Sequence, residues 1–305
     1  AAEVLAFNAV YTDIYSSVGT PGTTPSATLT YLQAGVKLTD LSTPLRGRVA
    51  VLDPLAMSTL ANTTSSLFNP TAVISENYEE GMFGRKQLGV DKWLQDPVRP
   101  THTTGTYTAS TPLVNGADQT GSTTYTASTP LINGASQTGS TIATNGWASG
   151  AATLNKGDII TIAGVNSVNP LSYSSTGRLQ QFVITATTSD ASGVMATLPI
   201  SPSIITSGQL QTVDASPAND AVITVLGTTA AAGGTLAATS SPQSFVYHPD
   251  AFAFVMADLM KPGAGAESTT VRSKSLGFSI RMVEQYQIGT DQNPSRLDIL
   301  IGAAT

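Results

Sequence analysis

Apolar positions recur at two different periods along the chain, and the change of period divides the sequence into three parts. From Ala1 to Val18 the apolar residues lie on one face at helical spacing, so this segment is predicted to form an amphipathic helix. Gly19 and Pro21 end the predicted helix. Its apolar face consists of Val4, Phe7, Val10, Tyr11, Ile14 and Val18.

A second helix, a strand and a third helix follow, and together they predict a compact α/β lobe. Ser26 is the expected N-cap of the second helix. Arg48–Leu52 has the length and composition of a short strand. Asp53 and Pro54 then provide the N-cap and the first-turn proline of the third helix. The second helix is expected to carry its apolar face on Leu29, Leu32, Val36 and Leu41.

The middle of the chain is β-patterned, rich in Thr, Ser and Gly, and contains a near-perfect tandem duplication. Thr106–Thr123 and Thr124–Thr141 are two copies of one 18-residue sequence. The only differences are Val114/Ile132 and Asp118/Ser136. An Asn-Gly pair inside each copy is a strong hairpin-turn signal.

Four later runs in this middle part are predicted to be strands, because they are enriched in β-branched residues and bounded by turn residues. Their spacing is typical of a small barrel or sandwich. The four runs are Asp158–Val165, Gln181–Thr185, Met195–Ile200 and Ala221–Leu226.

The C-terminal part returns to longer strands. It opens with Phe245–His248, and the segment from Pro249 to Met256 predicts a short helix. Leu276–Tyr286 alternates between apolar and polar positions, so we expect a long strand with one buried face. After a turn at Asp291–Pro294, a second strand is expected at Leu297–Ile301.

Composition narrows the classes of function. Charged residues make up only 11% of the 305 residues, so Thr, Ser, Asn and Gln must cover much of the surface. Such a composition suits packed, β-rich surfaces that face other subunits. The net charge of -6 and the scattered basic residues argue against a dedicated nucleic-acid binder, which would carry a basic patch.

Cysteine content and hydropathy add further limits. The chain has no cysteine, so it has no disulfide framework and no thiolate metal site. No apolar run approaches the roughly 18 residues of a membrane span. The chain opens inside an amphipathic pattern, without Met or the zones of a signal peptide, so a fragment or processed product of a longer polypeptide is expected.

No residue pattern indicates an enzyme. The two histidines, His102 and His248, lie on different segments and lack the nearby carboxylates of a metal site. Nucleophile-elbow and phosphate-loop patterns are absent from the sequence. The adjacent Glu79 and Glu80 point apart in regular structure, so pairing at an interface is expected rather than acid–base work. The sequence therefore predicts no catalytic, cofactor-binding or metal-binding residues.

Four segments resemble the coat protein of short-tailed Salmonella-type phages, a family among the major capsid proteins of tailed double-stranded DNA phages. Tyr78–Asp91 reads YEEGMFGRKQLGVD and is similar to a motif of that family. Leu154–Val165 resembles the Gly-Asp strand opening of the family's insertion domain. Arg48–Pro54 and Ser295–Ala303 are two further similar segments. The order of the predicted parts also resembles that family over nearly the whole chain, although the tandem repeat is not part of its pattern.

The resemblance implies an α+β chain with a Hong Kong 97-type capsid fold. In that fold a spine helix and long antiparallel strands frame an apical α/β lobe, here with an inserted β-barrel domain. The implied boundaries are residues 1–20 for the spine helix of the peripheral domain, 21–100 for the first part of the apical domain, 101–243 for the inserted β-rich domain with the repeat, 244–268 for the return of the apical domain and 269–305 for the peripheral strands.

The resemblance also implies a function. A major capsid protein of this kind is structural, and it self-assembles as hexamers and pentamers into an icosahedral shell that encloses double-stranded DNA. Other copies of the chain are then its main partners. Scaffolding, portal and decoration proteins are further implied partners. Contact with packaged DNA is expected to be weak and non-specific, and no membrane contact is expected. The implied location is the virion capsid, after assembly in the host cytoplasm. The candidate subunit-interface residues are Tyr78, Glu79, Glu80, Arg85, Trp93 and Arg281.

Two questions stay open at the level of the sequence. The low charge and the Thr/Ser-rich repeats also fit a secreted or surface β-rich adhesin, which is the alternative function. The inserted domain is expected either to stabilise the monomer and guide its folding, or to project outward and touch neighbours or decoration.

Overall fold

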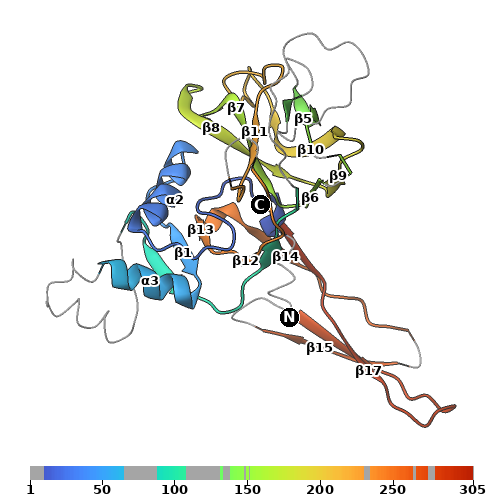
Figure 1. Cartoon of the computed structure of the whole chain (residues 1–305). Helices are drawn as coiled ribbons and strands as arrows, with labels where there is room; N and C mark the ends of the chain where they lie inside the picture. The colour runs from blue at the N-terminus through green and yellow to red at the C-terminus, as the bar shows by residue number, and fades with distance from the viewer. Residues whose placement is uncertain are drawn as a thin grey trace, which may run out of the picture. The chain divides into compact units, whose positions relative to one another are not determined.

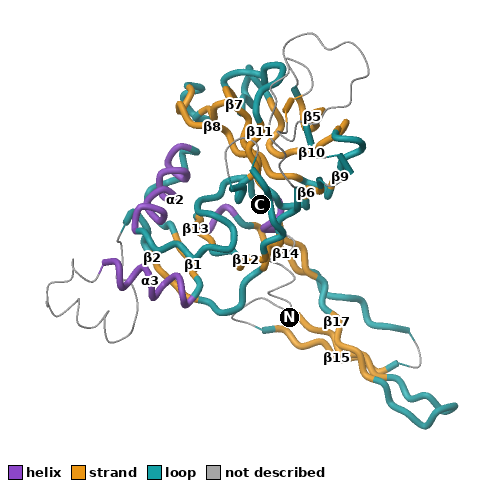
Figure 2. Tube along the Cα trace, viewed as in Figure 1, coloured by secondary structure: helices purple, strands orange, loops and turns teal. Residues whose placement is uncertain are grey.

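The chain forms two compact units, one of residues 11–249 and one of residues 250–305 together with residues 1–10 (Figure 1). The computed structural model describes residues 10–64, 88–107, 131–132, 138–147, 149–150, 152–229, 234–263, 266–273 and 279–304. Strands outnumber helices throughout these residues (Figure 2), in agreement with the α+β class. Among them, no helix has both the length and the apolar content needed to cross a membrane.

The first unit begins with the predicted α/β lobe. Its sheet has β1 (Val49–Leu52) at the centre, between the antiparallel β13 (Phe245–Tyr247) and the parallel β2 (Lys92–Gln95). Two helices, α2 (Thr28–Asp40) and α3 (Pro54–Thr64), pack against this sheet. The lobe core consists of Tyr31, Ala50, Leu52, Ala56, Met57, Leu60, Val90 and Trp93.

The sequence predicted the start of one lobe helix correctly and the start of the other wrongly. The third predicted helix is confirmed, because α3 starts at Pro54 and the backbone of Asp53 accepts a hydrogen bond from the Met57 amide. The predicted N-cap at Ser26 is wrong, since α2 is preceded by Ala27 and has no side-chain cap. The second predicted helix is itself confirmed as α2, in which Tyr31 is the buried residue.

The inserted part is an antiparallel sheet, and the four strands predicted there are confirmed. The strand order is β11-β7-β8-β10-β5-β4, with β11 and β4 as the two edges among the described strands. The bounds are β4 (Leu131–Ile132), β5 (Gly139–Asn145), β7 (Ile159–Val168), β8 (Ser175–Ile184), β10 (Val194–Ile204) and β11 (Ile223–Val225). A separate short pair joins β6 (Thr153–Leu154) to β9 (Thr188–Ser189). Most of the tandem repeat lies outside the described residues.

The sheet encloses a core that is larger than that of the lobe. Trp147 is 1% exposed, and the ring of Tyr107 meets it edge-on at a centroid distance of 5.6 Å. The remaining core residues come mainly from β5, β7, β8, β10 and β11. They include Ile142, Leu154, Ile160, Ile162, Phe182, Ile184, Leu198, Ile200 and Ile223.

Two segments connect the inserted sheet to the lobe, residues 100–107 and residues 236–243, and we call them together the neck. Within the neck, β3 (Thr101–Thr103) pairs with β12 (Ser240–Pro242) in antiparallel fashion. Backbone hydrogen bonds continue the pairing on both sides of these strands, from Thr104 to Thr239 and from Gln243 to Pro100.

The segment after residue 10 departs from the predicted long helix. Tyr11–Asp13 forms one 3₁₀ turn, η1, and residues 14–25 contain no regular structure. Ile14 and Val18 instead point into a cavity between the lobe and the neck, so each still finds apolar surroundings without a helix. The helix prediction is therefore wrong beyond Asp13, and residues 1–9 of that prediction lie outside the described residues.

The second unit is built from strands. β14 (Ala253–Met256) pairs with β18 (Ile301–Ala304), and a three-stranded antiparallel sheet has the order β15-β16-β17. The bounds of that sheet are β15 (Glu267–Arg272), β16 (Ser279–Glu284) and β17 (Ser295–Asp298). The helix predicted through Met256 is wrong, because only the 3₁₀ turn η3 (Pro249–Ala251) forms before β14. The predicted strand Leu297–Ile301 is divided between β17 and β18, which have different partners.

Candidate assembly surfaces

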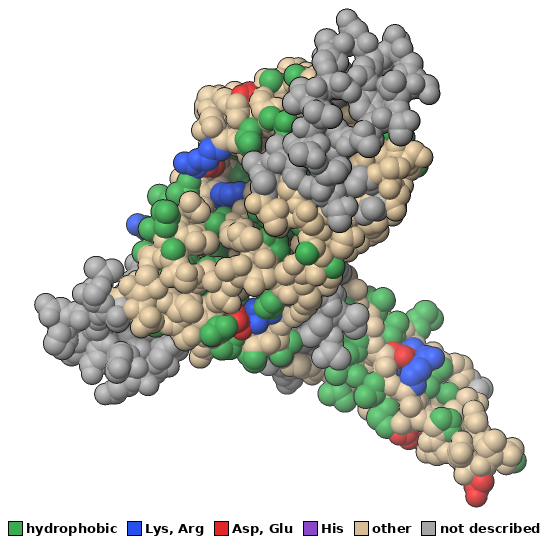
Figure 3. All heavy atoms as spheres, in the orientation of Figure 1, with side chains coloured by type: hydrophobic (Ala, Val, Ile, Leu, Met, Phe, Trp, Pro, Cys, Tyr) green, Lys and Arg blue, Asp and Glu red, His purple; other side chains and the backbone are tan. Residues whose placement is uncertain are grey.

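One face of the β15-β16-β17 sheet carries an exposed apolar row. Val271 of β15 lies opposite Ile280 of β16, and Met282 of β16 lies opposite Leu297 of β17. Paired residues share a face of the sheet, and positions two apart on a strand do as well, so these four side chains lie together. Their exposed fractions are 66%, 40%, 37% and 70% in the same order. Figure 3 shows hydrophobic side chains over the part of the molecule where Figure 1 places β15 and β17.

The opposite face of this sheet is polar and internally paired. Asp298 accepts a hydrogen bond from Arg281 on the neighbouring strand at 2.5 Å. It also forms an ion pair with Arg296 at 2.8 Å. These two guanidinium groups lower the pKa of the Asp298 carboxyl. Arg281 also donates to the carbonyl of Met260. This predicted interface residue is therefore engaged within its own unit, with 13% of its side chain exposed.

The remaining predicted interface residues divide into two groups. Tyr78, Glu79, Glu80 and Arg85 lie outside the described residues. Trp93 is only 2% exposed and meets the ring of Tyr31 edge-on at 6.2 Å, so it is a core residue of the lobe. In the single chain β2 turns the Trp93 side chain inward, and the expected subunit contact at Trp93 stays a prediction.

The outward side of α2 forms a second exposed apolar stripe. Leu29, Leu32 and Val36 follow helical spacing and are all exposed, whereas Tyr31 on the inward side is buried. The apolar spacing of these residues predicted the helix, and the structure places the stripe on the exposed side of α2. The reason is that α2 contacts the lobe sheet with its other side.

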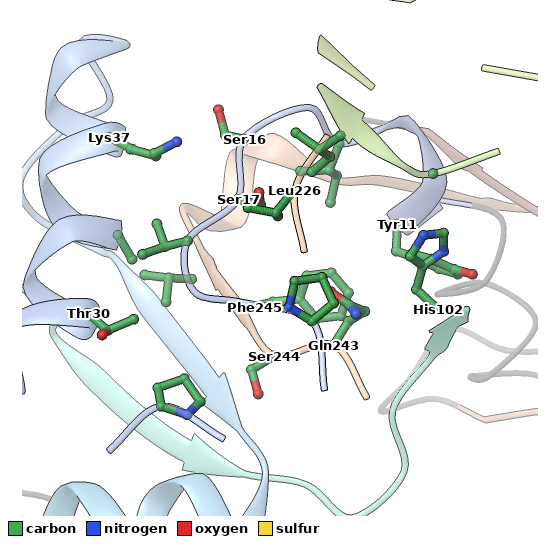
Figure 4. A pocket seen from close by; sticks show the side chains of 18 of the residues that line it. Tyr11, Ser16, Ser17, Thr30, Lys37, His102, Leu226, Gln243, Ser244 and Phe245 are labelled. Carbon is green, nitrogen blue, oxygen red and sulfur yellow. The ribbon is translucent and has the colours of Figure 1, made fainter. Parts of the chain in front are cut away.

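A cavity of about 220 Å³ lies between α2, residues 14–25, β13 and the neck. In Figure 4, Lys37 projects from the α2 side, while Tyr11 and His102 lie at the opposite side. The wall is mainly apolar, and no group of three or more His, Cys, Asp or Glu side chains among the described residues could hold a metal ion. Nothing in the cavity wall assembles a nucleophile with a base.

Lys37 joins α2 to the inserted sheet at this cavity. Its ammonium donates to the side-chain carbonyl of Gln181, which also accepts a hydrogen bond from the Ser17 amide at 2.9 Å. Burial lowers the pKa of Lys37 to about 8, with Asp40 acting in the opposite direction and Arg178 in the same direction. A pairing of Asp40 with Arg178 adds a further contact between α2 and β8.

The two histidines have different structural surroundings. His102 is 8% exposed on β3, and its Nε2 lies 2.9 Å from Oδ1 of the buried Asp158. Near His248, a side chain at Gly47 would come within 3.0 Å of the imidazole, and Gly47 has a positive φ of 87°. Both rings therefore serve packing in this chain. The sequence did not predict the contact between His102 and Asp158, since 56 positions separate them.

Three comparisons with known proteins complete the description. The family model of the P22 coat protein, gene protein 5, matches residues 4–305. No curated protein matched the chain. Among solved structures, the CUS-3 coat protein I-domain matches with 28% identity over 35% of this chain and 99% of that one, at a TM-score of 0.25.

Proposed function

Because the chain belongs to the P22 coat protein family and is thereby a structural phage capsid protein, we propose that it assembles as hexamers and pentamers into an icosahedral shell around double-stranded DNA. The proposed fold is of the Hong Kong 97 type. Residues 1–20 and 269–305 then form its peripheral domain, and residues 21–100 and 244–268 form its apical domain. The sheet of residues 101–243 is the inserted domain, which we expect to close into a barrel.

The observation that supports self-assembly best is the exposed row on β15, β16 and β17. Soluble monomers rarely leave a contiguous apolar patch open, and such patches mark interaction sites. Val271 and Leu297 are each about two-thirds exposed although they lie on a regular sheet face. The occupant that a coat protein itself offers is a second copy of the chain.

Shell formation needs contacts that close into rings. A heterologous contact joins two different surfaces of one subunit and generates a ring when its rotation closes. The apolar sheet face and the α2 stripe are two such different surfaces. A standard interface buries about 1,600 Å² in total, and much of its gross stabilisation is offset by the costs of association. Because each contact has a modest net affinity, a misplaced subunit can dissociate. The many contacts of the closed shell together stabilise it.

The other partners follow from the same proposal. Scaffolding, portal and decoration proteins would meet the shell during or after assembly in the host cytoplasm. Contact with packaged DNA would be weak and non-specific, because the chain contains only 14 basic residues and 20 acidic residues. The inserted domain would stabilise the subunit, since its sheet contains the larger of the two cores.

The alternative function, a secreted or surface adhesin, has less support. It would explain the low charge and the Thr/Ser repeats, but it gives no reason for membership of a coat protein family. An enzyme has no support in the cavity, where the described wall offers neither a metal cluster nor a nucleophile–base pair.

Negative-stain electron microscopy and sedimentation of the expressed protein test the proposal. We expect closed particles of uniform size that form without nucleic acid. A monomer or small oligomer with glycan affinity, at concentrations where other coat proteins assemble, would support the adhesin instead.

A further inference from the structure

The neck is where the inserted sheet can turn relative to the lobe, because a pair of short strands makes the connection. β3 and β12 contribute three residue pairs, and the isolated bridge between Tyr107 and Leu236 adds one more. A two-stranded ribbon of this length is stabilised mainly by what packs on it. The orientation of the inserted sheet therefore depends on side-chain contacts at the neck.

One buried carboxylate makes three contacts there. Asp158 stands just before β7 of the inserted sheet, and it is 2% exposed. Its Oδ2 accepts hydrogen bonds from the Gly105 amide at 3.0 Å and from the Asn155 amide at 2.7 Å. Its Oδ1 faces His102 Nε2 at 2.9 Å, so the imidazole donates through this nitrogen. Two of the three donors, those of Gly105 and His102, belong to the neck.

The imidazole is fixed from its other sides as well. A Cβ atom at Gly157 would lie 3.0 Å from His102 Cε1, so the ring rests against that glycine, which has a φ of 96°. Tyr11 meets the ring edge-on at 6.0 Å and donates through its hydroxyl to the Thr101 carbonyl at 3.3 Å. Figure 4 shows Tyr11 and His102 side by side at the cavity wall.

Burial makes this arrangement selective for one orientation. A carboxylate removed from water is tolerated only while its hydrogen-bond donors stay in place, and losing one donor leaves a buried charge with incomplete compensation. Turning the inserted sheet about the neck would take Asp158 away from His102 and Gly105 together. The Gln181 side chain, which Lys37 contacts from α2, carries no charge. The ion pairs between the inserted sheet and residues 11–40 are also weaker in this respect. Lys156 with Asp13, and Arg178 with Asp40, are both solvent-accessible pairs.

We infer that the contact between Asp158 and His102 is a latch that sets the orientation of the inserted sheet on the lobe, and that breaking it lets the sheet swing at the neck. His102 acts as a positioning residue in this device. The latch concerns a single chain, so it does not depend on shell formation and is tested on unassembled protein.

Electron–electron distance measurements provide the test. The chain has no cysteine, so spin labels at Ser58→Cys on α3 and Ser189→Cys on β9, both exposed positions, report the separation of lobe and inserted sheet. We expect one narrow distance distribution in the otherwise unchanged protein. In His102→Ala the distribution should broaden at least twofold or gain a second maximum. In His102→Gln, whose side-chain amide retains a donor at the position of Nε2, the narrow distribution should largely return.

Two controls separate a latch from general destabilisation. Lys156→Ala removes the exposed pair next to the latch and should leave the distribution narrow. Hydrogen exchange of the Gly105 and Asn155 amides should rise about tenfold or more in His102→Ala, while amides of β7 and β8 stay protected. If His102→Ala does not fold, Gly157→Ala decides the matter, because its new methyl group displaces the ring without removing a donor. An unchanged distribution in the folded His102→Ala or Gly157→Ala protein overturns the inference.

Discussion

Met282 and Leu297 lie opposite each other on β16 and β17 of a regular sheet, and both side chains are exposed to solvent. The neighbouring pair of Arg281 and Asp298 points to the other face and is linked by a hydrogen bond of 2.5 Å. Arg281 and Asp298 are thus paired on one face of the sheet, while the apolar side chains on the other face are exposed in the single chain.

A charge on the apolar face should block self-association without unfolding the subunit. Val271 and Thr270 are adjacent on β15 and point to opposite faces. We expect Val271→Asp to raise the concentration needed for assembly more than tenfold, because the new carboxylate would be desolvated in the contact. Thr270→Asp adds the same charge opposite Arg281 and should assemble normally. Light scattering measures both, and equal assembly of the two variants would exclude the apolar face as the contact.

Arg48 should be essential for the end of α2. This side chain is 2% exposed and donates to the carbonyls of Gly35, Thr43 and Pro44 and to the Thr39 hydroxyl. Arg48→Met removes four hydrogen bonds of a buried guanidinium to partly buried groups, so the free energy of unfolding of the lobe should fall by about 3 kcal/mol. Arg46→Met at an exposed position is the matched control and should change it by less than about 0.5 kcal/mol.

The two tryptophans allow this loss of stability to be located. Trp93 lies in the core of the lobe and Trp147 lies in the core of the inserted sheet. Urea titrations of single-tryptophan variants should show the effect of Arg48→Met in the Trp93 signal first. A larger effect at Trp147 would mean that Arg48 does not act through α2.

Lys37 should make stability depend on pH in the alkaline range. Its pKa of about 8 in the folded protein lies below the ordinary lysine value of 10.5, so the unfolded chain binds more protons between these two pH values. The free energy of unfolding should therefore rise as the pH increases from about 8 toward 10.5. Lys37→Met should remove this rise and stabilise the protein at pH 7 by about 1 kcal/mol, after allowance for partial solvent screening. Urea midpoints between pH 7 and 9.5 measure it, and identical slopes in both proteins would contradict the prediction.

Deleting one copy of the tandem repeat should leave the inserted sheet folded. Tyr107 of the first copy is 4% exposed, packs on Trp147, and has its pKa raised to about 12 by burial. Removing Thr106–Thr123 brings Thr124 and Tyr125, which have the same sequence, to the same chain position. We expect soluble subunits and normal particles from this deletion, whereas Tyr107→Ala should lower the free energy of unfolding by about 3 kcal/mol. Insoluble protein after the deletion would show that both copies are required.

The sequence predicted the local elements well where a local signal defines them. Asp53 and Pro54 marked the start of α3, and β-branched runs marked β7, β8 and β10. It predicted the long helix through Val18 wrongly, because helical spacing of apolar residues is also met by an extended segment whose side chains enter a cavity. The sequence did not reveal that Trp93 lies in the core of the lobe, since a large aromatic side chain suits a core as well as a contact.

The sequence by itself determined that this chain is rich in β-structure and resembles a phage coat protein. Its period, turn residues and caps act over a few neighbouring positions, so they can be recognised without the fold. The tertiary structure alone decided which apolar residues became core, turning Tyr31 inward and Leu29 outward on one helix. It also brought Asp158 to His102, because burial and pairing depend on elements that are distant in the chain and meet only when it folds.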